Sequence, residues 1–294
     1  MDKAKSDVLD AALDRRQEAL EGGSDSEARL TLAYTSRLHR AWRPILSVMP
    51  VYPAWRILDV ATGYGMLPME LAALLPVRVH GIDLIQEYID GARAIASDLT
   101  VNTPGFFHPG SQLAFEVGDA MDLPCEDATY ELAIVRELLQ FLPDPIGALR
   151  ELHRTLIPGG YACVGDVDDQ LFLTWPPPSE AFQRLHAAIA SVQVQRGGDR
   201  HTGRKLTAYL RSAGFDVLNV VILSEAQHHV VSLEEPERAL VLEQFAGARQ
   251  RVMDAGMMSA AAYDRDVAAV AGEESHEQFR THARVVALAQ KGSS

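Results

Sequence analysis

The chain has 294 residues, of which 47% are hydrophobic and 23% charged, a composition sufficient for one large core. Its 27 basic and 40 acidic residues give a net charge of −13, which argues against nucleic acid and acidic membrane surfaces as partners. Its 2 cysteines exclude a disulfide framework, and the charged N-terminal stretch and the lack of a long apolar run predict a cytoplasmic protein without a membrane span.

The first fifty residues carry a helical pattern. Apolar side chains recur at helical spacing over about 3–20 and again over about 27–48, and "EGGSDSEA" separates the two stretches. Pro50 and Pro53 end the second stretch. We therefore predict that residues 1–50 form an N-terminal helical lid.

From residue 51 onward, short apolar runs alternate with helical stretches. The expected strands are 56–60, 77–83, 113–119, 130–135 and 161–167, and the expected helices lie near 64–75, 86–98 and 146–156. This alternation predicts an α/β fold with a doubly wound, mostly parallel sheet covered on both faces.

The second half of the chain continues the pattern with longer helical stretches. Helices are expected over about 179–195, 233–256 and 258–272, and two more strands over 215–223 and 283–290. The long connection before the last strand means that this strand need not be parallel to its neighbours. We assign residues 51–294 to one domain with helical insertions at about 170–200 and 230–275.

The stretch "ILDVATGYG" at 57–65 places a glycine turn directly after the first strand. Gly63 and Gly65 lack a Cβ, so the backbone can bend and approach a ligand closely. Asp83 ends the second strand, where a carboxylate can accept both hydroxyls of a ribose. This arrangement fits either NAD or S-adenosylmethionine.

Two features of the turn and one of the third strand favour S-adenosylmethionine over NAD. The third glycine of a G-x-G-x-x-G fingerprint is replaced by Pro68. Asp59 stands where it would repel a pyrophosphate but would suit an amino group. Asp119, at the end of the third strand, can accept an adenine amino group.

At this point the chain resembles the class I, Rossmann-like S-adenosylmethionine-dependent methyltransferases, especially the UbiE and small-molecule branch. "ILDVATGYG", "GIDL" and "GDAMDLP" are similar to the first three motifs of that family. "LLQFLPDPIGALRELHRTLIPGG" is similar to its fourth segment. The resemblance covers about 55–168 well and 195–223 less well.

The resemblance implies a seven-stranded sheet whose last strand is antiparallel, and it implies a set of cofactor contacts. Asp59, Gly63 and Gly65 would lie at the methionine end, together with Arg136, and Asp83 would hold the ribose. The remaining predicted cofactor contacts are Ala61 in the turn, Leu84 on the adenine face, and Asp119 with Ala120 at the adenine edge.

Relatives often carry a histidine in the loop after the fourth strand, whereas this chain has Gln140 and Phe141. The base for an acceptor hydroxyl is therefore open, and His201 in "GGDRHTGRKL" is the candidate catalytic residue. Asp199 and Arg204 in the same stretch are expected to pair. The predicted substrate-binding residues are Tyr34, Gln140, Asp166, Arg204 and His228.

The most direct interpretation is methyl transfer from S-adenosylmethionine to a small-molecule acceptor, such as a bacterial secondary metabolite or a quinone-like compound, with S-adenosylhomocysteine as product. A second interpretation keeps the cofactor but replaces transfer by cyclisation or isomerisation. The sequence also leaves open a non-catalytic module that binds the cofactor, and a nicotinamide dehydrogenase. No metal-ligand spacing is present, and a homodimer is possible.

Overall fold

The computed structural model describes residues 5, 7–13, 15, 39–231, 236–274 and 276–293. Predictions that fall elsewhere, including the predicted substrate contact Tyr34 and most of the proposed N-terminal lid, lie outside the described residues. Within the described part of the chain, no helix combines the length and the apolar character that a membrane crossing requires.

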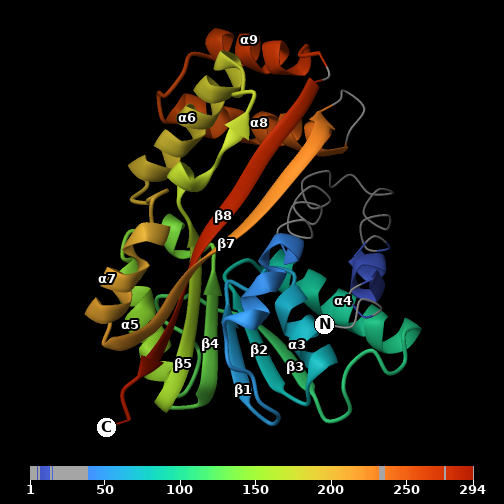
Figure 1. Cartoon of the computed structure of the whole chain (residues 1–294), viewed down its shortest axis with the longest axis vertical. Helices are drawn as coiled ribbons and strands as arrows, with labels where there is room; N and C mark the ends of the chain where they lie inside the picture. Colours follow the sequence, from blue (N-terminus) through green and yellow to red (C-terminus); the bar gives the residue numbers. More distant parts are fainter. Residues whose placement is uncertain are drawn as a thin grey trace.

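Five parallel strands form the first part of one mixed sheet (Figure 1). Their bounds are β1 (Arg56–Val60), β2 (Arg78–Asp83), β3 (Gln112–Val117), β4 (Tyr130–Arg136) and β5 (Leu156–Val167). They lie in the order β3-β2-β1-β4-β5, so the order reverses between β1 and β4. Ligands of doubly wound sheets bind at the carboxyl ends of the strands at such a reversal.

Helices cover both faces of these strands because alternate strand residues carry apolar side chains to both sides. On one face, Leu58 and Val60 pack with α5 (Pro145–Thr155) and α7 (Leu206–Ser212). On the other face, Ile57 packs with α3 (Met66–Leu74), and α4 (Gln86–Asn102) packs beside α3. The predicted doubly wound architecture is confirmed.

The last strand of the chain, β8 (His276–Lys291), lies antiparallel between β5 and β7 (Phe215–Val231). The predicted antiparallel last strand is therefore confirmed. The predicted number of seven strands was wrong, because the described residues form an eight-stranded sheet in which the two-residue β6 (Thr174–Trp175) pairs with the outer part of β8. So short a strand leaves no apolar alternation in the sequence.

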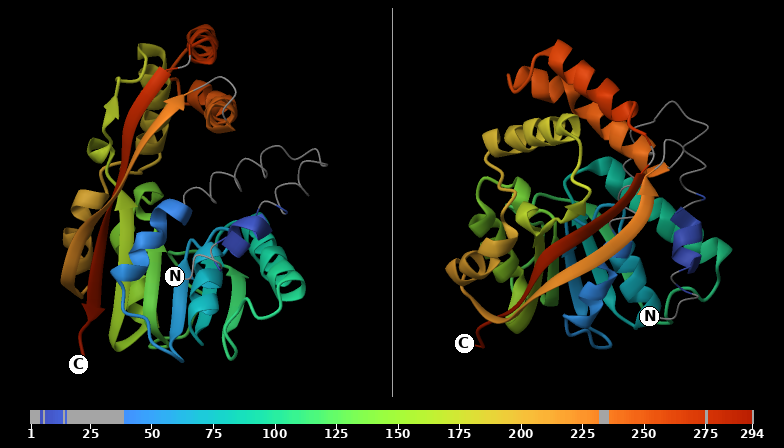
Figure 2. Two further views of the ribbon diagram at one scale, coloured as in Figure 1. Left: turned by 45° about the vertical axis from the view of Figure 1, so that its right-hand side comes forward. Right: turned by 45° about the horizontal axis from the view of Figure 1, so that its top comes forward.

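Both β7 and β8 are longer than predicted, since 215–223 and 283–290 mark only their inner halves. The outer halves pair with each other as a ribbon that leaves the sheet (Figures 1 and 2). A two-stranded ribbon has little core to face, so its polar sequence "SEAQHH" carries no strand pattern.

A group of three helices lies at the outer end of this ribbon, beyond the carboxyl ends of the parallel strands (Figure 2). These helices are α6 (Glu180–Gln195), α8 (Pro236–Asp254) and α9 (Ala260–Ala271), and we refer to them as the helical cap. Leu185, Phe245 and Tyr263 form its buried core. This core is separate from those that flank the sheet.

The N-terminal segment packs on the rest of the domain at two places, once on helices and once on the sheet. Residues 7–13 are helical, and Leu9 and Leu13 pack into the core formed by α3 and α4. Residues 39–42 are helical and continue into the 3-10 helix η1 (Arg43–Ser47), which ends before Pro50 as expected. Trp42 and Ile45 are buried there against the sheet.

Candidate active site

A small cavity of about 70 Å³ lies where the sheet order reverses, at the carboxyl ends of β1 and β4. Its walls come from the N-terminal segment, the turn after β1, the start of α3 and the end of β4. The lining residues are His39, Trp42, Ala61, Thr62, Gly63, Met66, Arg136 and Glu137. We call it the inner cavity.

The glycine turn that borders the inner cavity depends on the left-handed backbone conformation. Gly63 and Gly65 have φ values of 56° and 70°. A Cβ on Gly65 would lie 2.4 Å from the Phe115 ring, so no other residue fits this close approach. The sequence therefore places glycine where both conformation and space require it.

Asp83, at the end of β2, holds this turn. Its Oδ2 accepts the Gly63 N–H at 2.8 Å, and its Oδ1 accepts the Ile85 N–H at 3.1 Å. Burial raises the pKa of Asp83, and these backbone hydrogen bonds counteract part of that effect. Each carboxylate oxygen retains a second acceptor site, which agrees with a ribose-binding role.

Asp59 lies at the floor of the site and is 1% exposed. Its Oδ2 accepts the Thr62 hydroxyl at 2.7 Å and lies 3.7 Å from Nη2 of Arg136. Burial raises the pKa of Asp59, although Arg136 acts in the opposite direction. Its Oδ1 and Nε of Arg136 have no hydrogen-bond partner among the described residues. A ligand that carries both a cationic and an anionic group would satisfy both atoms.

Two non-glycine residues beside the inner cavity also adopt the left-handed conformation. Ala61 has a φ of 57° and Glu137 a φ of 50°. Each costs about 1–2 kcal/mol of backbone strain, and such strain concentrates at functional sites. Glu137 is held there by Nε1 of Trp42 at 2.9 Å and Nε of Arg284 at 2.6 Å.

The predicted adenine contacts lie outward from the turn. Leu84 is 66% exposed, and the nearby loop presents the half-exposed Met121. Asp119 is exposed, accepts the Met121 N–H at 2.9 Å, and precedes the partly buried Ala120. An exposed leucine beside an acceptor suits the face and the edge of a base, so the roles of these residues stay predictions.

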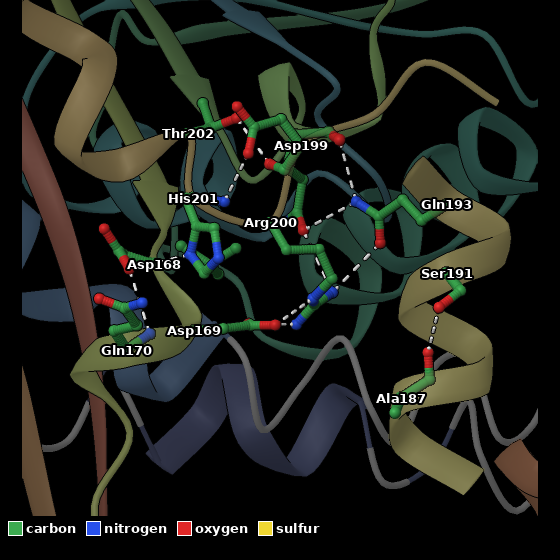
Figure 3. A network of polar contacts seen from close by, with 12 residues as sticks. Asp168, Asp169, Gln170, Ala187, Ser191, Gln193, Asp199, Arg200, His201 and Thr202 are labelled. Carbon is green, nitrogen blue, oxygen red and sulfur yellow. Dashed lines mark hydrogen bonds and ion pairs between the residues drawn. The ribbon is translucent and has the colours of Figure 1, made fainter. Parts of the chain in front are cut away.

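A second cavity, of about 400 Å³, lies beyond the end of β5, and we call it the outer cavity. Its walls come from the 3-10 helix η3 (Asp169–Leu171), α6 and the 199–201 loop. The lining residues are Asp169, Ala190, Ser191, Val194, Gln195, Asp199, Arg200 and His201. Figure 3 shows the Arg200 guanidinium between Asp169 on one side and Gln193 of α6 on the other.

Asp168 organises the wall that carries the candidate base His201. The Asp168 side chain is 2% exposed, and Arg204 contacts both of its oxygens, Nη2 at 2.6 Å from Oδ1. These contacts hold the pKa of Asp168 well below its usual range, at about 2. Nδ1 of His201 lies 3.3 Å from the same carboxylate.

The expected pairing of Asp199 with Arg204 was therefore wrong. Asp199 instead contacts Lys205, while Arg204 reaches Asp168. The turn into η4 (Gly203–Lys205) directs the two consecutive side chains to different carboxylates. Linear proximity within "GGDRHTGRKL" did not reveal this, because Asp168 comes from the end of β5.

Gln140 lies after the end of β4 and contacts the loop that lines the outer cavity. It lies in η2 (Leu139–Phe141), three residues after Glu137, and is 3% exposed. Its backbone oxygen accepts the Asp199 N–H at 2.8 Å and Nε2 of Gln193 at 2.9 Å. Gln140 thus supports the 199–201 loop that lines the outer cavity, which adds a structural role to its predicted contact with substrate.

Asp166 is fully buried beneath this loop. Its carboxylate accepts the Gln140 N–H at 3.1 Å and the Val167 N–H at 2.8 Å. Burial raises the pKa of Asp166 to about 7, since the hydrogen bonds offset only part of the desolvation. The Asp166 carboxylate therefore supports the backbone at Gln140 and Val167, and its predicted contact with substrate stays a prediction.

His228 lies away from both cavities. It was expected to follow the sixth strand, but it lies within the outer half of β7, and its side chain is 65% exposed. Its nearest charged partner is Glu277 of β8, at 4.0 Å. The prediction placed the end of this strand at residue 223, where the apolar run ends, whereas β7 continues to Val231.

Sequence reasoning missed three ionisable residues beside the inner cavity: His39, Glu70 and Glu137. Glu137 follows the predicted cofactor residue Arg136, so its position in the chain was a usable signal. The other two depend on how the N-terminal segment packs on α3, which no local pattern indicates. Among the described residues, no three His, Cys, Asp or Glu side chains gather in an arrangement suited to a metal ion.

A doubly wound sheet with a glycine turn after β1 and a carboxylate at the end of β2 defines a Rossmann-like nucleoside-binding protein. Comparison with known proteins identifies the branch. A family described as "Methyltransferase domain" matches residues 58–164, which includes β1 through most of β5.

Relatives and solved structures agree with this match. The 27-O-demethylrifamycin SV methyltransferase of Amycolatopsis mediterranei is 27% identical over 78% of this chain and 75% of its own length. The O-methyltransferase cnsE of Penicillium expansum is 30% identical over 58% of this chain and 55% of its own length. The solved [4+2]-cyclase SpnF shares the fold, with a TM-score of 0.54, 21% identity, and coverage of 87% and 82%.

Over residues 58–164 the chain is similar to the class I S-adenosylmethionine-dependent methyltransferases, and this similarity supports S-adenosylmethionine as the cofactor. The described residues fit this group, because the unpaired atoms of Asp59 and Arg136 suit the amino and carboxyl groups of its methionine part. The chain spans 54–66% of the length of four curated relatives, cnsE among them.

Proposed function

We propose that the protein transfers a methyl group from S-adenosylmethionine to an oxygen of a small molecule. The observation that carries this proposal is the inner cavity, where buried, unpaired acidic and basic atoms meet at the reversal of the sheet. The names of the relatives from Amycolatopsis and Penicillium support an oxygen acceptor. A bacterial secondary metabolite or a quinone-like compound is the substrate class to test.

The acceptor is proposed to bind in the outer cavity, between the end of β5 and α6. Ala190 and Val194 give this cavity an apolar wall, whereas Asp169 and Arg200 provide a charged one. Mixed walls of this kind suit an organic molecule with a few polar groups. Gln140 contacts Asp199 of this region and lies three residues after Glu137 of the inner cavity, which supports a shared role in one reaction.

His201 is proposed as the base that removes the acceptor proton. Asp168 lies 3.3 Å from its Nδ1, so the carboxylate can orient the ring and leave Nε2 available to a hydroxyl. The sulfonium of the cofactor supplies an electrophilic methyl group. The protein positions the acceptor and excludes water. His201 accepts the hydroxyl proton, so that the oxygen becomes a better nucleophile as it bonds to the methyl group.

The test is incubation of the purified protein with S-adenosylmethionine and a panel of phenols, macrolactones and quinols. We expect a product that is heavier by one methylene, together with release of S-adenosylhomocysteine. His201→Ala should lower kcat by about 10²–10⁴-fold at unchanged S-adenosylhomocysteine affinity. An unchanged kcat would remove His201 from the mechanism and leave methyl transfer in place.

The same assay separates methyl transfer from two different activities. The fold of the [4+2]-cyclase SpnF shows that this architecture also occurs in an enzyme named for cyclisation. A cofactor-dependent product of unchanged mass would establish cyclisation or isomerisation instead. Binding of the cofactor without turnover of any acceptor would point to a non-catalytic module.

A further inference from the structure

The N-terminal segment is fixed above the inner cavity by Trp42. The ring of Trp42 packs against Gly165 of β5, where a Cβ would lie 2.4 Å from the indole. Its Nε1 donates to Glu137, and the Arg284 guanidinium lies 5.4 Å from the ring centroid. These contacts place the preceding helical turn beside the cofactor site.

His39 lies on that turn, three residues before Trp42, and lines the same cavity. It is 3% exposed, and its Nε2 lies 3.1 Å from Oε2 of Glu70 on α3. Glu70 is itself 1% exposed, and Nε of Arg43 lies 3.3 Å from its other oxygen. His39 therefore lines the cavity and contacts the buried carboxylate of Glu70, which in turn contacts Arg43.

Both ring nitrogens of His39 and both oxygens of Glu70 are buried without a hydrogen bond of normal geometry among the described residues, and Nε2 has only its 3.1 Å ion-pair contact with Glu70, whereas Nδ1 has no contact of either kind. A buried, unpaired nitrogen is costly, so it indicates a position that a ligand completes. The charged groups that face His39 are Glu70, Arg43 and Arg136, and burial lowers the pKa of His39 so that the neutral ring predominates. Because the carboxylate of Glu70 lies 3.1 Å from Nε2, it favours the tautomer that carries the proton on Nε2, and Nδ1 is then the acceptor that faces a ligand.

We propose that His39 binds the amino group of the methionine part of S-adenosylmethionine, and that Glu70 positions it for this contact. Oδ1 of Asp59 supplies a second acceptor for the same group, and Arg136 remains for the carboxyl group. The amino group and the carboxyl group of the methionine part are thus recognised by different side chains at one small cavity. The inference depends on the cofactor site and not on the acceptor or the base.

The experiment compares two ligands on the full chain by calorimetric titration. S-adenosylhomocysteine carries the amino and carboxyl groups, whereas 5′-methylthioadenosine has the adenosine and the thioether but neither group. In His39→Ala we expect S-adenosylhomocysteine affinity to fall about 10- to 100-fold. Affinity for methylthioadenosine should stay within about 2-fold, because that ligand has nothing for His39 to bind.

His80→Ala is the matched control. His80 also lies near a glutamate, with Nε2 3.2 Å from Glu116, but it belongs to the interior of β2 and does not line the cavity. Both ligands should bind His80→Ala as they bind the wild type. Glu70→Gln keeps an acceptor for Nε2–H and should retain most of the affinity for S-adenosylhomocysteine. Glu70→Leu should lower the affinity for S-adenosylhomocysteine and leave that for methylthioadenosine unchanged.

Equal losses for the two ligands in His39→Ala would overturn the proposal, because they would assign His39 to packing of the segment. Unchanged affinities would overturn it as well. His39→Gln, which retains a polar side chain, provides the comparison if His39→Ala does not fold. A wild-type protein that binds neither ligand would refute the cofactor site itself, a result distinct from a selective failure of His39.

Discussion

The two walls of the candidate site are built in different ways. The wall formed by β1, β2 and α3 depends on backbone: Gly63 and Gly65 in left-handed conformations, and Asp83 bound to the N–H of the turn. The wall formed by the end of β5 and the 199–205 loop depends on side-chain ion pairs, such as Asp169 with Arg200. The first wall cannot change without disturbing the fold, whereas the second can exchange residues while its backbone is retained.

The largest effect should come from Gly65→Ala on the backbone wall. The new Cβ would meet the Phe115 ring at 2.4 Å and would occupy a φ of 70°. We expect the free energy of unfolding to fall by about 2–4 kcal/mol and S-adenosylhomocysteine binding to be lost. Denaturant titration and calorimetry measure the two quantities.

Gly247→Ala is the control for that experiment, since a Cβ there has no heavy atom within 4 Å. This substitution lies inside α8 and should leave binding intact while raising stability by up to about 1 kcal/mol. If Gly65→Ala behaved like Gly247→Ala, the turn would not have the rigidity described above.

Asp166→Asn tests the region between the walls by its pH dependence. The folded pKa of about 7 exceeds the ordinary value of 3.8, so the folded protein retains a proton that the unfolded chain releases. Wild-type stability should therefore fall relative to the variant as pH rises from about 4 to 7, by up to about 4 kcal/mol. Urea titrations at several pH values measure this difference, and parallel curves for the two proteins would refute the raised pKa.

Asp83→Ala should weaken both S-adenosylhomocysteine and methylthioadenosine, by about 10- to 100-fold, because the ribose contact is common to both ligands. This pattern contrasts with the selective loss expected for His39→Ala. Asp90→Ala on the exposed face of α4 serves as the control and should bind both ligands normally. If only the affinity for S-adenosylhomocysteine fell, Asp83 would not be the residue that binds the ribose.

The smallest effect should come from Arg204→Ala on the ion-pair wall. Arg204 is 45% exposed, so solvent screens its contact with Asp168 and the loss of stability should be small. The folded pKa of Asp168 is depressed to about 2, so this contribution is present above about pH 4 and is lost as pH falls toward 2. S-adenosylhomocysteine affinity should not change, and a tenfold loss would show that the two walls are coupled.

The difference between the walls also explains what the sequence could predict. Gly63 and Gly65 lie in the turn directly after β1, and Asp83 ends β2. Each of them can therefore be recognised within a short stretch of sequence. The partner of Arg204 and the contact between His39 and Glu70 join segments that are far apart in the chain. Their geometry follows from packing, which no local periodicity encodes.

The same reasoning applies to the fold. The strands β1, β4 and β5 were predicted because each is largely buried and forms an apolar run in the sequence, while β2 and the edge strand β3 retain enough apolar residues to be recognised. The outer halves of β7 and β8 were missed because they pair mainly with each other, away from the core, and so lack an apolar pattern. His228 was misplaced for that reason, while the domain boundaries and the pairing of two copies stay predictions.

The ribbon of β7 and β8 has a consequence for how this protein could diversify. Val231 and His276 are paired neighbours, so the chain leaves the ribbon and returns to it at adjacent positions. The intervening segment, which includes α8 and α9, is topologically the loop of one β-hairpin. It could be shortened, lengthened or replaced by recombination without rethreading the sheet, so new acceptors could be accommodated while the inherited cofactor site is left as it is.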